Sequence, residues 1–197
     1  MMDLKQLRAA TEKEHRAIEG VMPIMAADLS LSTYQSVLSA LYGILRAWDE
    51  WAERHAPPDL RQETLTRLRS PLLEADLAYF HLPVPQQRAT LDLPMSEAGF
   101  LGAMYVMEGS TLGGQYIARH VEQTLGLQPG KGDAYFIGYG EHTSERWRVF
   151  QGILRDLPEH QTAEVISGAR AMFTQFRLWM VKQFEKGIRA ELQTHGR

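Results

Sequence analysis

The sequence of 197 residues contains no cysteine. Disulfide bridges, thiolate zinc sites, iron–sulfur clusters and cysteine nucleophiles all need a thiol, so none of them is available to this chain. Any metal ion must be held by histidine or by oxygen ligands. With 44% hydrophobic and 23% charged residues, the composition is otherwise that of an ordinary globular protein, and we expect one domain over residues 1–197.

An excess of positive charge is also missing. The chain has 21 basic and 24 acidic residues, a net charge of −3, and no basic cluster. Attraction to phosphates dominates nucleic-acid affinity, so nucleic acid is not an expected partner. The first residues run directly into charged helical sequence, which predicts neither a secretory signal nor a membrane span. We therefore expect a cytoplasmic protein that does not bind membranes.

Apolar residues recur at spacings of three and four along almost every long segment, which predicts an all-α fold. We expect a compact bundle of six or seven helices. Two loops should interrupt it, one proline-rich over residues 79–95 and one glycine-rich over residues 126–140. Thr143 or Ser144 could cap the helix that follows the second loop. The predicted helices cover residues 4–22, a segment through residues 34–48 that ends before Pro57, and residues 59–77, 96–125, 143–154 and 161–192.

Seven histidines are available, and none lies in a familiar catalytic or metal motif. The sequence has no HExxH spacing of a zinc protease, no pair of Glu-x-x-His motifs of a di-iron bundle, and no G-x-S-x-G elbow of a serine hydrolase. The usual hydrolase and metal signatures are therefore absent. The histidines are His15, His55, His81, His120, His142, His160 and His195.

His15 differs from the others because the pattern places it on the apolar face of the first helix. Arg8 lies seven residues earlier and so points the same way, since seven residues return a helix to within about 20° of the same side. Glu19 follows at i+4, where its carboxylate could orient one ring nitrogen and leave the other free to bind a metal. A half-buried structural His–Glu pair is the alternative, and such pairs are common.

Ten of the sixteen glycines lie between residues 99 and 140, and several are inside helical sequence. Each helical glycine costs about 0.8–1 kcal/mol relative to alanine. Gly102, Gly109 and Gly113 fall within about 20° of one face, which forms a narrow stripe without side chains. A flat ligand could lie against that stripe, or a second helix could pack closely on it. A phosphate-binding loop is disfavoured because the segment lacks the lysine that a P-loop needs.

Three segments together carry a family resemblance. They are the helix of residues 7–19, the sequence YVMEGSTLGGQY of residues 105–116, and the stretch of residues 136–147 that contains FIGYG and ERW. Their order and spacing, over nearly the whole chain, resemble the heme oxygenase family. The closest likeness is to the bacterial branch that often accompanies phytochromes.

The resemblance implies that a heme lies between two helices. His15 would be the iron ligand on one side, with Glu19 beside it, and backbone at Gly109 and Gly113 would cover the other side. Tyr105 would also contact the heme, and Arg8 occupies the position at which the family keeps a basic residue for a heme propionate. Arg146, or else Arg148 or Arg177, would supply further propionate contacts.

The resemblance also implies a reaction in which heme is both cofactor and substrate. Heme is cleaved with O2 to biliverdin, carbon monoxide and ferrous iron. Electrons must come from an external donor such as a ferredoxin or its reductase, since the chain has no flavin or nicotinamide motif. Biliverdin could pass to a bacteriophytochrome.

One departure concerns proton delivery. Well-known members have an aspartate directly after the first distal glycine, and this chain has Ser110 there. Glu108 is not expected to replace it, because it lies about 100° around the helix from Gly109, on the opposite side from Ser110. A heme-binding or heme-delivery protein on the same fold is therefore the alternative function. A thiaminase-like relative is disfavoured because that enzyme relies on a cysteine, and a pure interaction domain comes third.

Overall fold

The computed structural model describes the backbone of residues 1–194 and the side chains of residues 1–185, so His195 lies outside the described residues. Residues 1–194 contain helices and no strand, which confirms the all-α prediction. Three of the α-helices are short, and four single 3₁₀ turns occur at residues 23–25, 58–60, 140–142 and 159–161. The α-helices are α1 (Leu4–Glu19), α2 (Leu31–His55), α3 (Arg61–Leu65), α4 (Ser70–Tyr79), α5 (Glu97–Leu125), α6 (Ala134–Ile137), α7 (Thr143–Asp156) and α8 (Thr162–Thr194).

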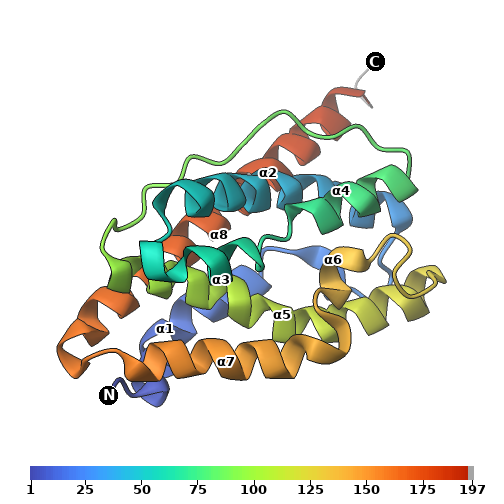
Figure 1. The fold of residues 1–197 in the computed structure, drawn as a ribbon. Coiled ribbons are helices and arrows are strands. Elements are labelled where there is room, and N and C mark those ends of the chain that lie inside the picture. The colour runs from blue at the N-terminus through green and yellow to red at the C-terminus, as the bar shows by residue number, and fades with distance from the viewer. Residues whose placement is uncertain (195–197) are drawn as a thin grey trace.

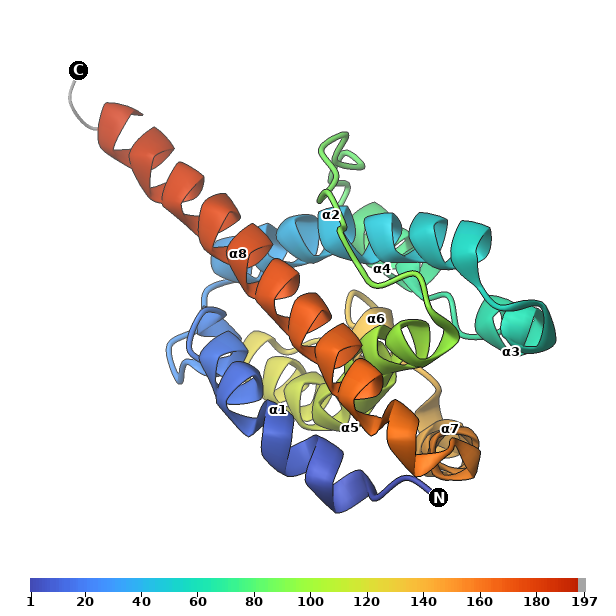
Figure 2. The same cartoon turned by 90° about the vertical axis from the view of Figure 1, so that its left-hand side faces the viewer.

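Helix α5 is the centre of the bundle. It packs most extensively against α8 and also contacts α6 and α7, while α1 lies along α8 and α2 pairs with α4. Figure 1 shows α5 crossing the middle of the molecule between α2 and α7. Figure 2, turned by 90°, shows α8 running diagonally across α5 and α1. None of the helices in the described part of the chain is long and apolar enough to cross a membrane.

The long helices begin at residues that satisfy free backbone amides. The Asp3 carboxylate accepts from Lys5 N at the start of α1, and Ser30 Oγ accepts from Thr33 N at the start of α2. Ser96 Oγ accepts from Gly99 N, so α5 begins where the sequence predicted. It ends at Gly126, whose φ of +68° is a left-handed conformation that favours glycine.

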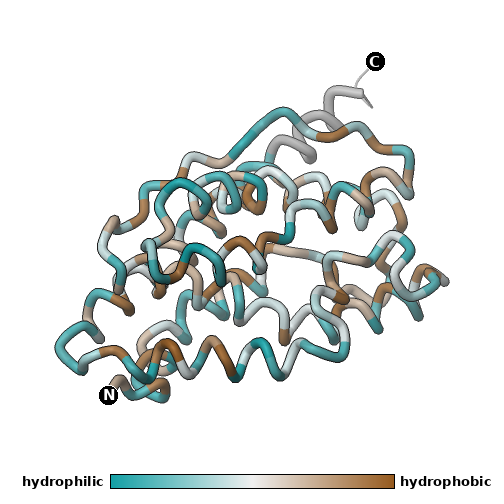
Figure 3. The backbone as a smooth tube through the Cα atoms, in the orientation of Figure 1, coloured by the Kyte–Doolittle hydropathy of each residue, from teal (hydrophilic) through white to brown (hydrophobic). Residues whose placement is uncertain are grey.

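The core lies between α2, α5 and α8 and contains large side chains that are essentially free of solvent. Tyr34, Phe100 and Phe150 are each at most 1% exposed. Along α7, hydrophobic and hydrophilic residues alternate in Figure 3, as expected for a helix with one buried side. Burial of these aromatic side chains fixes the position of α5 against its neighbours.

The predicted helix over residues 59–77 is wrong in one respect, since the structure divides it into α3 and α4. Pro71 lies in the first turn of α4. A proline has no N–H and its ring clashes with the carbonyl four residues earlier, so the helix cannot continue through Arg67. The break lets two arginines, Arg67 and Arg69, turn into the interior.

Smaller differences concern helix ends. Helix α1 stops at Glu19, because Gly20 is its C-cap, so Met22 lies outside it. The glycine-rich connection of residues 126–140 contains the short helix α6. Helix α7 begins at Thr143, with His142 rather than Thr143 or Ser144 at the capping position; the Thr143 hydroxyl donates to the carbonyl of Gly140 instead.

Candidate functional site

The glycine stripe of α5 has two different environments. A Cβ placed on Gly102 would lie 2.0 Å from the carbonyl oxygen of Val165 in α8, and one on Gly168 would lie 2.0 Å from the carbonyl oxygen of Gly99. These glycines bring the two helix backbones into direct contact. Of the two alternatives for the glycine stripe, close packing of a second helix therefore applies at Gly102, because α8 fills the space beside it.

Further along α5 the stripe is open. A Cβ on Gly113 would meet no atom within 4 Å. At Gly109 it would meet only the indole ring of Trp147, at 3.8 Å, which is ordinary van der Waals contact. Bare backbone is therefore accessible at two of the three predicted positions.

The side chain of Tyr105 in α5 reaches α1 just before this open stretch. Burial raises the pKa of the Tyr105 phenol, while a hydrogen bond with Thr11 and the positive charge of Arg8 act in the opposite direction. These interactions place Arg8 of α1 near Tyr105 of α5. The resemblance implies a heme contact for each of these two residues. The ring centroid of Trp147 lies 5.7 Å from that of Tyr105 and closes this end.

His15 lies one helical turn after Thr11, and Gly109 lies one turn after Tyr105. Both figures show α1 and α5 running in the same general direction, so the two residues lie on the same side of the Thr11–Tyr105 contact. Gly113 lies one turn further. The exposed edge of α1 and the bare stretch of α5 thus both follow the Thr11–Tyr105 contact.

The side chain of His15 is 59% exposed, so the prediction that it lies on the buried face is wrong. Helix α1 buries Leu7 and Thr11 instead, and His15 lies at the edge of that stripe. The expected pairing with Glu19 is present, with 3.5 Å between His15 Nδ1 and Glu19 Oε1. The ring also packs edge-on against Phe173 of α8, at 5.9 Å between centroids. Nδ1 therefore has a carboxylate partner, and Nε2 has no hydrogen-bond partner within the described chain.

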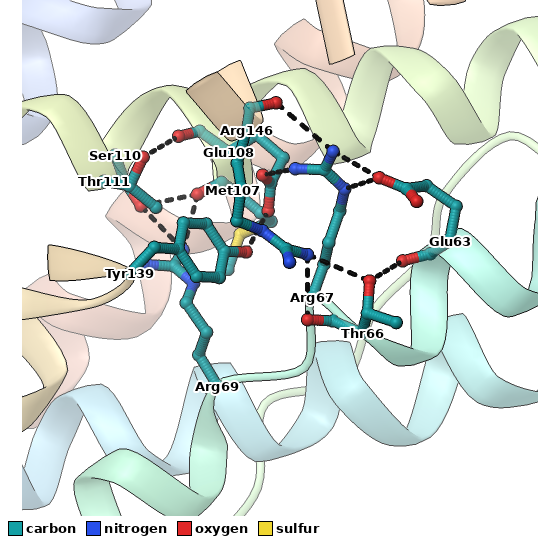
Figure 4. A network of polar contacts seen from close by, with 10 residues as sticks. All are labelled: Glu63, Thr66, Arg67, Arg69, Met107, Glu108, Ser110, Thr111, Tyr139 and Arg146. Atoms are coloured by element: carbon teal, nitrogen blue, oxygen red, sulfur yellow. Dashed lines mark hydrogen bonds and ion pairs between the residues drawn. The ribbon is translucent and has the colours of Figure 1, made fainter. Parts of the chain in front are cut away.

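Ser110 is exposed beside Gly109, and a buried arginine lies directly beneath it. Arg69, 3% exposed, donates through Nη2 to Ser110 Oγ at 2.9 Å and to the carbonyl oxygen of Met107 (Figure 4). The Ser110 hydroxyl donates to the same carbonyl at 2.6 Å. The guanidinium carbon lies 5.3 Å from the ring centroid of Tyr135 and 6.0 Å from that of Tyr139. A positive charge is thus held beneath Ser110, the residue at which the resemblance places an aspartate in other members.

Glu108 points away from Ser110 into a buried ion-pair network, in agreement with its expected position around the helix. Its carboxylate accepts from the guanidinium of Arg67 and from the hydroxyl of Tyr139, the latter at 2.8 Å (Figure 4). Burial raises the pKa of Tyr139 strongly, and the negative charge of Glu108 acts in the same direction. Arg67 is also bound to Glu63. The network borders a surface cleft of about 460 Å³.

Arg146 lies at this cleft and not with Arg8 and Tyr105. Its Nη2 donates to the carbonyl and hydroxyl oxygens of Thr66, both at 2.9 Å, and its guanidinium carbon lies 4.3 Å from the Tyr139 ring centroid. Of the other two arginines considered, Arg148 is exposed on α7. Arg177 lines a groove with Phe173, on whose ring His15 packs. Arg177 is therefore the better placed of the three for a ligand beside His15.

Sequence reasoning missed Arg69, Tyr135 and Phe173 around the open stretch, and it noted Tyr139 and Trp147 only as parts of a motif. Arg69 lies 41 positions from Ser110 along the chain, and no periodic pattern links two such residues. The break before Pro71 was the one available signal, because a charged residue at a broken helix can turn inward.

A family model described as heme oxygenase matches residues 2–182 of this chain. A heme oxygenase from Xanthomonas campestris is 31% identical over 151 residues, which cover 75% of this chain and 88% of that protein. The chain belongs to the heme oxygenase family. It is an enzyme of the heme-degrading class, as the resemblance implied.

Solved structures agree on the fold of this heme oxygenase family member. The heme oxygenase of Neisseria meningitidis has a TM-score of 0.75 at 22% identity, covering 92% of this chain and 91% of that one. Heme oxygenase-1 of Synechocystis, solved with heme, has a TM-score of 0.69 at 17% identity and covers 96% of each chain. A Shewanella denitrificans domain of unknown function has a TM-score of 0.71 at 10% identity, covering 97% of this chain and 96% of that one. The fold is therefore shared with a protein whose function is not assigned, and function must be argued from side chains.

Proposed function

We propose that the protein binds heme between α1 and α5 and cleaves it with O2 to biliverdin, carbon monoxide and ferrous iron. The observation that carries this proposal is that His15 and the bare backbone of Gly109 and Gly113 lie on the same side of the Thr11–Tyr105 contact. A flat ligand bound to His15 can approach α5 only where no side chain intervenes, and these two glycines meet that need.

The residues present fit a heme. Nε2 of His15 is the proposed iron ligand, because the Glu19 carboxylate beside Nδ1 favours the tautomer that leaves Nε2 free to bind a metal. Arg8 and Tyr105 are the proposed propionate partners, since a guanidinium and a phenol can both donate to a carboxylate. Arg177 is proposed as a further cation for the second propionate, in place of Arg146. When bound, heme supplies the redox chemistry and is itself the substrate.

Arg69 and Ser110 are proposed to hold a water molecule at the open face. The Ser110 hydroxyl donates its hydrogen bond to Met107 O and accepts one from Arg69. One lone pair of its oxygen is therefore left to accept a hydrogen bond from a water molecule. Because Arg69 is buried and fixed at four sites, that geometry does not depend on solvent. A serine held by an arginine could therefore order the proton source that an aspartate orders elsewhere.

We further propose that electrons come from an external donor such as a ferredoxin or its reductase, and that biliverdin passes to a bacteriophytochrome. The chain has no flavin or nicotinamide motif of its own that could supply the electrons. We propose too that residues 1–197 act as one domain in the cytoplasm, supported by a core of buried residues that extends from Met2 to Met180.

Hemin titration followed by turnover tests the proposed function. We expect one equivalent of hemin to give a histidine-ligated Soret band, and reduction under O2 to replace that band with biliverdin absorbance. His15→Ala should lose the histidine-ligated spectrum, and added imidazole should restore it. His160→Ala is the matched control, because His160 is an exposed histidine on another element.

The outcomes separate the two candidate functions. A stable Soret band under reducing conditions and O2 would show a heme-binding protein without degradation. No Soret shift, and no rise in melting temperature with hemin, would contradict both readings, because a ligand that binds the native state must stabilise it.

A further inference from the structure

Asp76 of α4 is a buried carboxylate with no part in the proposed chemistry. It is 1% exposed, and its two oxygens accept from two successive backbone amides of α6, Ala134 N at 2.7 Å and Tyr135 N at 2.9 Å. Hydrogen bonds to an ionised carboxylate are stronger than those to a neutral acceptor. One side chain of α4 therefore fixes the first turn of a four-residue helix that is too short to be stable alone.

Helix α6 carries Tyr135 to the candidate site. The Tyr135 ring faces the guanidinium of Arg69 at 5.3 Å. Burial raises the pKa of Tyr135, whereas the charge of Arg69 and a hydrogen bond with Ser110 act in the opposite direction. Asp76 holds the backbone of Tyr135, and the side chain of Tyr135 contacts both groups that lie beside Gly109.

Helix α4 brings Arg69 to the other side of this contact. Arg69 immediately precedes α4, and Asp76 follows it by seven residues, about two turns and on about the same side. Helix α4 thus holds Arg69 at its start and α6 near its end. Displacement of α6 would remove one wall from Arg69 while leaving its bonds to Met107 and Ser110 unsupported.

We propose that Asp76 is a positioning residue of the heme site, which holds Tyr135 against Arg69 and Ser110 through the amides of α6. This inference rests on the proposed function, because it assigns a purpose to the Arg69–Ser110 pair at the open face. Asp76 touches neither the heme nor the open face; it acts through Tyr135.

Asp76→Asn tests the proposal, because an asparagine keeps one accepting oxygen and turns an N–H₂ group toward the second amide. The lost hydrogen bond should speed hydrogen exchange of the α6 amides by about tenfold in the heme-free protein. Asp133→Asn is the matched control. Asp133 is equally buried in the same segment, but its carboxylate accepts from Gly130 N, and only its backbone carbonyl accepts from amides of α6.

The second readout is spectroscopic and concerns the heme site. In the ferric hemin complex, we expect the pH midpoint of the acid–alkaline transition to shift by about half a unit or more in Asp76→Asn, since hydrogen-bond donors near an ionising group move its pKa. Tyr135→Phe should shift it in the same direction, and it tests the same path if Asp76→Asn does not fold. Asp133→Asn should leave the midpoint unchanged, and hemin affinity should stay close to wild type in all three variants.

Equal midpoints in Asp76→Asn, Tyr135→Phe and wild type would overturn the positioning role. So would exchange of the α6 amides that is no faster in Asp76→Asn than in wild type. A wild-type protein that gives no Soret band with hemin would instead contradict the proposed function itself, so the two failures are distinguishable.

Discussion

The two halves of α5 use glycine in opposite ways. In the first half, Gly99 and Gly102 lie against the backbone of α8, where Gly168 completes the contact. In the second half, Gly109 and Gly113 face ordinary contact or open space. Gly114 is the exception in the second half, because it is buried and a Cβ there would lie 2.6 Å from the carbonyl oxygen of Phe136. The difference between the packed and the open glycines comes from the neighbour that the fold brings to each.

The two halves differ in what offsets the free-energy cost of glycine in a helix. Each glycine costs about 0.8–1 kcal/mol in a helix interior. In the first half, close packing of α5 on α8 offsets that cost within the protein alone. In the second half no protein contact offsets the cost of Gly113. Burial of roughly 500 Å² of a porphyrin would offset it, since that burial contributes about 12 kcal/mol gross at 25 cal/mol/Å².

The largest expected effect is on the packed half. Gly102→Ala should destabilise the protein, because its Cβ would meet the backbone of Val165 at 2.0 Å, and a backbone cannot move aside as a side chain can. We expect a loss of about 2–3 kcal/mol, or about 4–12 °C in melting temperature. Thermal unfolding of the heme-free protein measures it. A melting temperature equal to or above that of wild type would show that α8 does not hold this half closed.

The stability of the segment that begins α6 should depend on pH, because Asp133 there is a buried carboxylate. Burial, with the neighbouring Glu122 carboxylate next in effect, raises the pKa of Asp133 from 3.8 to about 6. The folded state thus favours protonated Asp133, and its contribution to stability is lost as pH rises from about 4 through 6. Asp133 Oδ2 has no hydrogen-bond partner, so a proton there breaks no bond.

Asp133→Asn should therefore raise the melting temperature at pH 8 by about 2–8 °C, which corresponds to about 1–2 kcal/mol, and should change it little at pH 5. Melting curves of both proteins at the two pH values test this. Gly102→Ala provides the comparison from the packed half, where its effect should be the same at both pH values. A variant less stable than wild type at pH 8 would refute the assignment.

A smaller effect of opposite sign to that of Gly102→Ala is expected in the open half. Gly113→Ala should stabilise the heme-free protein by about 1 kcal/mol, or about 2–4 °C, because its Cβ meets nothing and alanine favours the helix. Gly152→Ala in α7 is the control, since a Cβ there also meets no atom within 4 Å. If Gly113→Ala were destabilising while Gly152→Ala was not, the face at Gly113 would not be open.

The smallest expected effect is at the junction of α1 and α5. Tyr105→Phe removes a phenol that interacts with Thr11 and Arg8. We expect loss of about 0.5–1.5 kcal/mol of hemin binding, a factor of about 2 to 12 in Kd, with little change in melting temperature. Hemin titration by absorbance measures it. An unchanged Kd would remove Tyr105 from the proposed propionate contacts.

Much of the fold could be predicted from the sequence, and the causes are local. Ser96 caps α5 and the Pro57–Pro58 pair follows the end of α2, because capping and proline sterics act over a few residues. The break before Pro71 was equally local and was overlooked. The role of Gly102 was not predictable in the same way, because helical periodicity gives a direction but not the helix that occupies it.

The candidate site was predicted less completely. Helical spacing and the family likeness together identified His15, Glu19, Arg8 and Tyr105, and the structure brings these into two pairs. Arg69 could not be found, because its contact with Ser110 depends on how α4 packs beside α5. The resemblance implied that Arg146 contacts a heme propionate, but in the structure Arg146 donates to Thr66 and lies against the ring of Tyr139.

Hemin titration of Gly113→Leu tests the central claim most directly, with Gly152→Leu as the size-matched control. The account predicts that wild type and Gly152→Leu each take up one equivalent with the same Soret band. Gly113→Leu should remain folded, melt no lower than wild type without heme, and give no such band, because its side chain occupies the space of the porphyrin. Normal hemin binding by Gly113→Leu would contradict the claim that the bare backbone of α5 is the wall of the heme site.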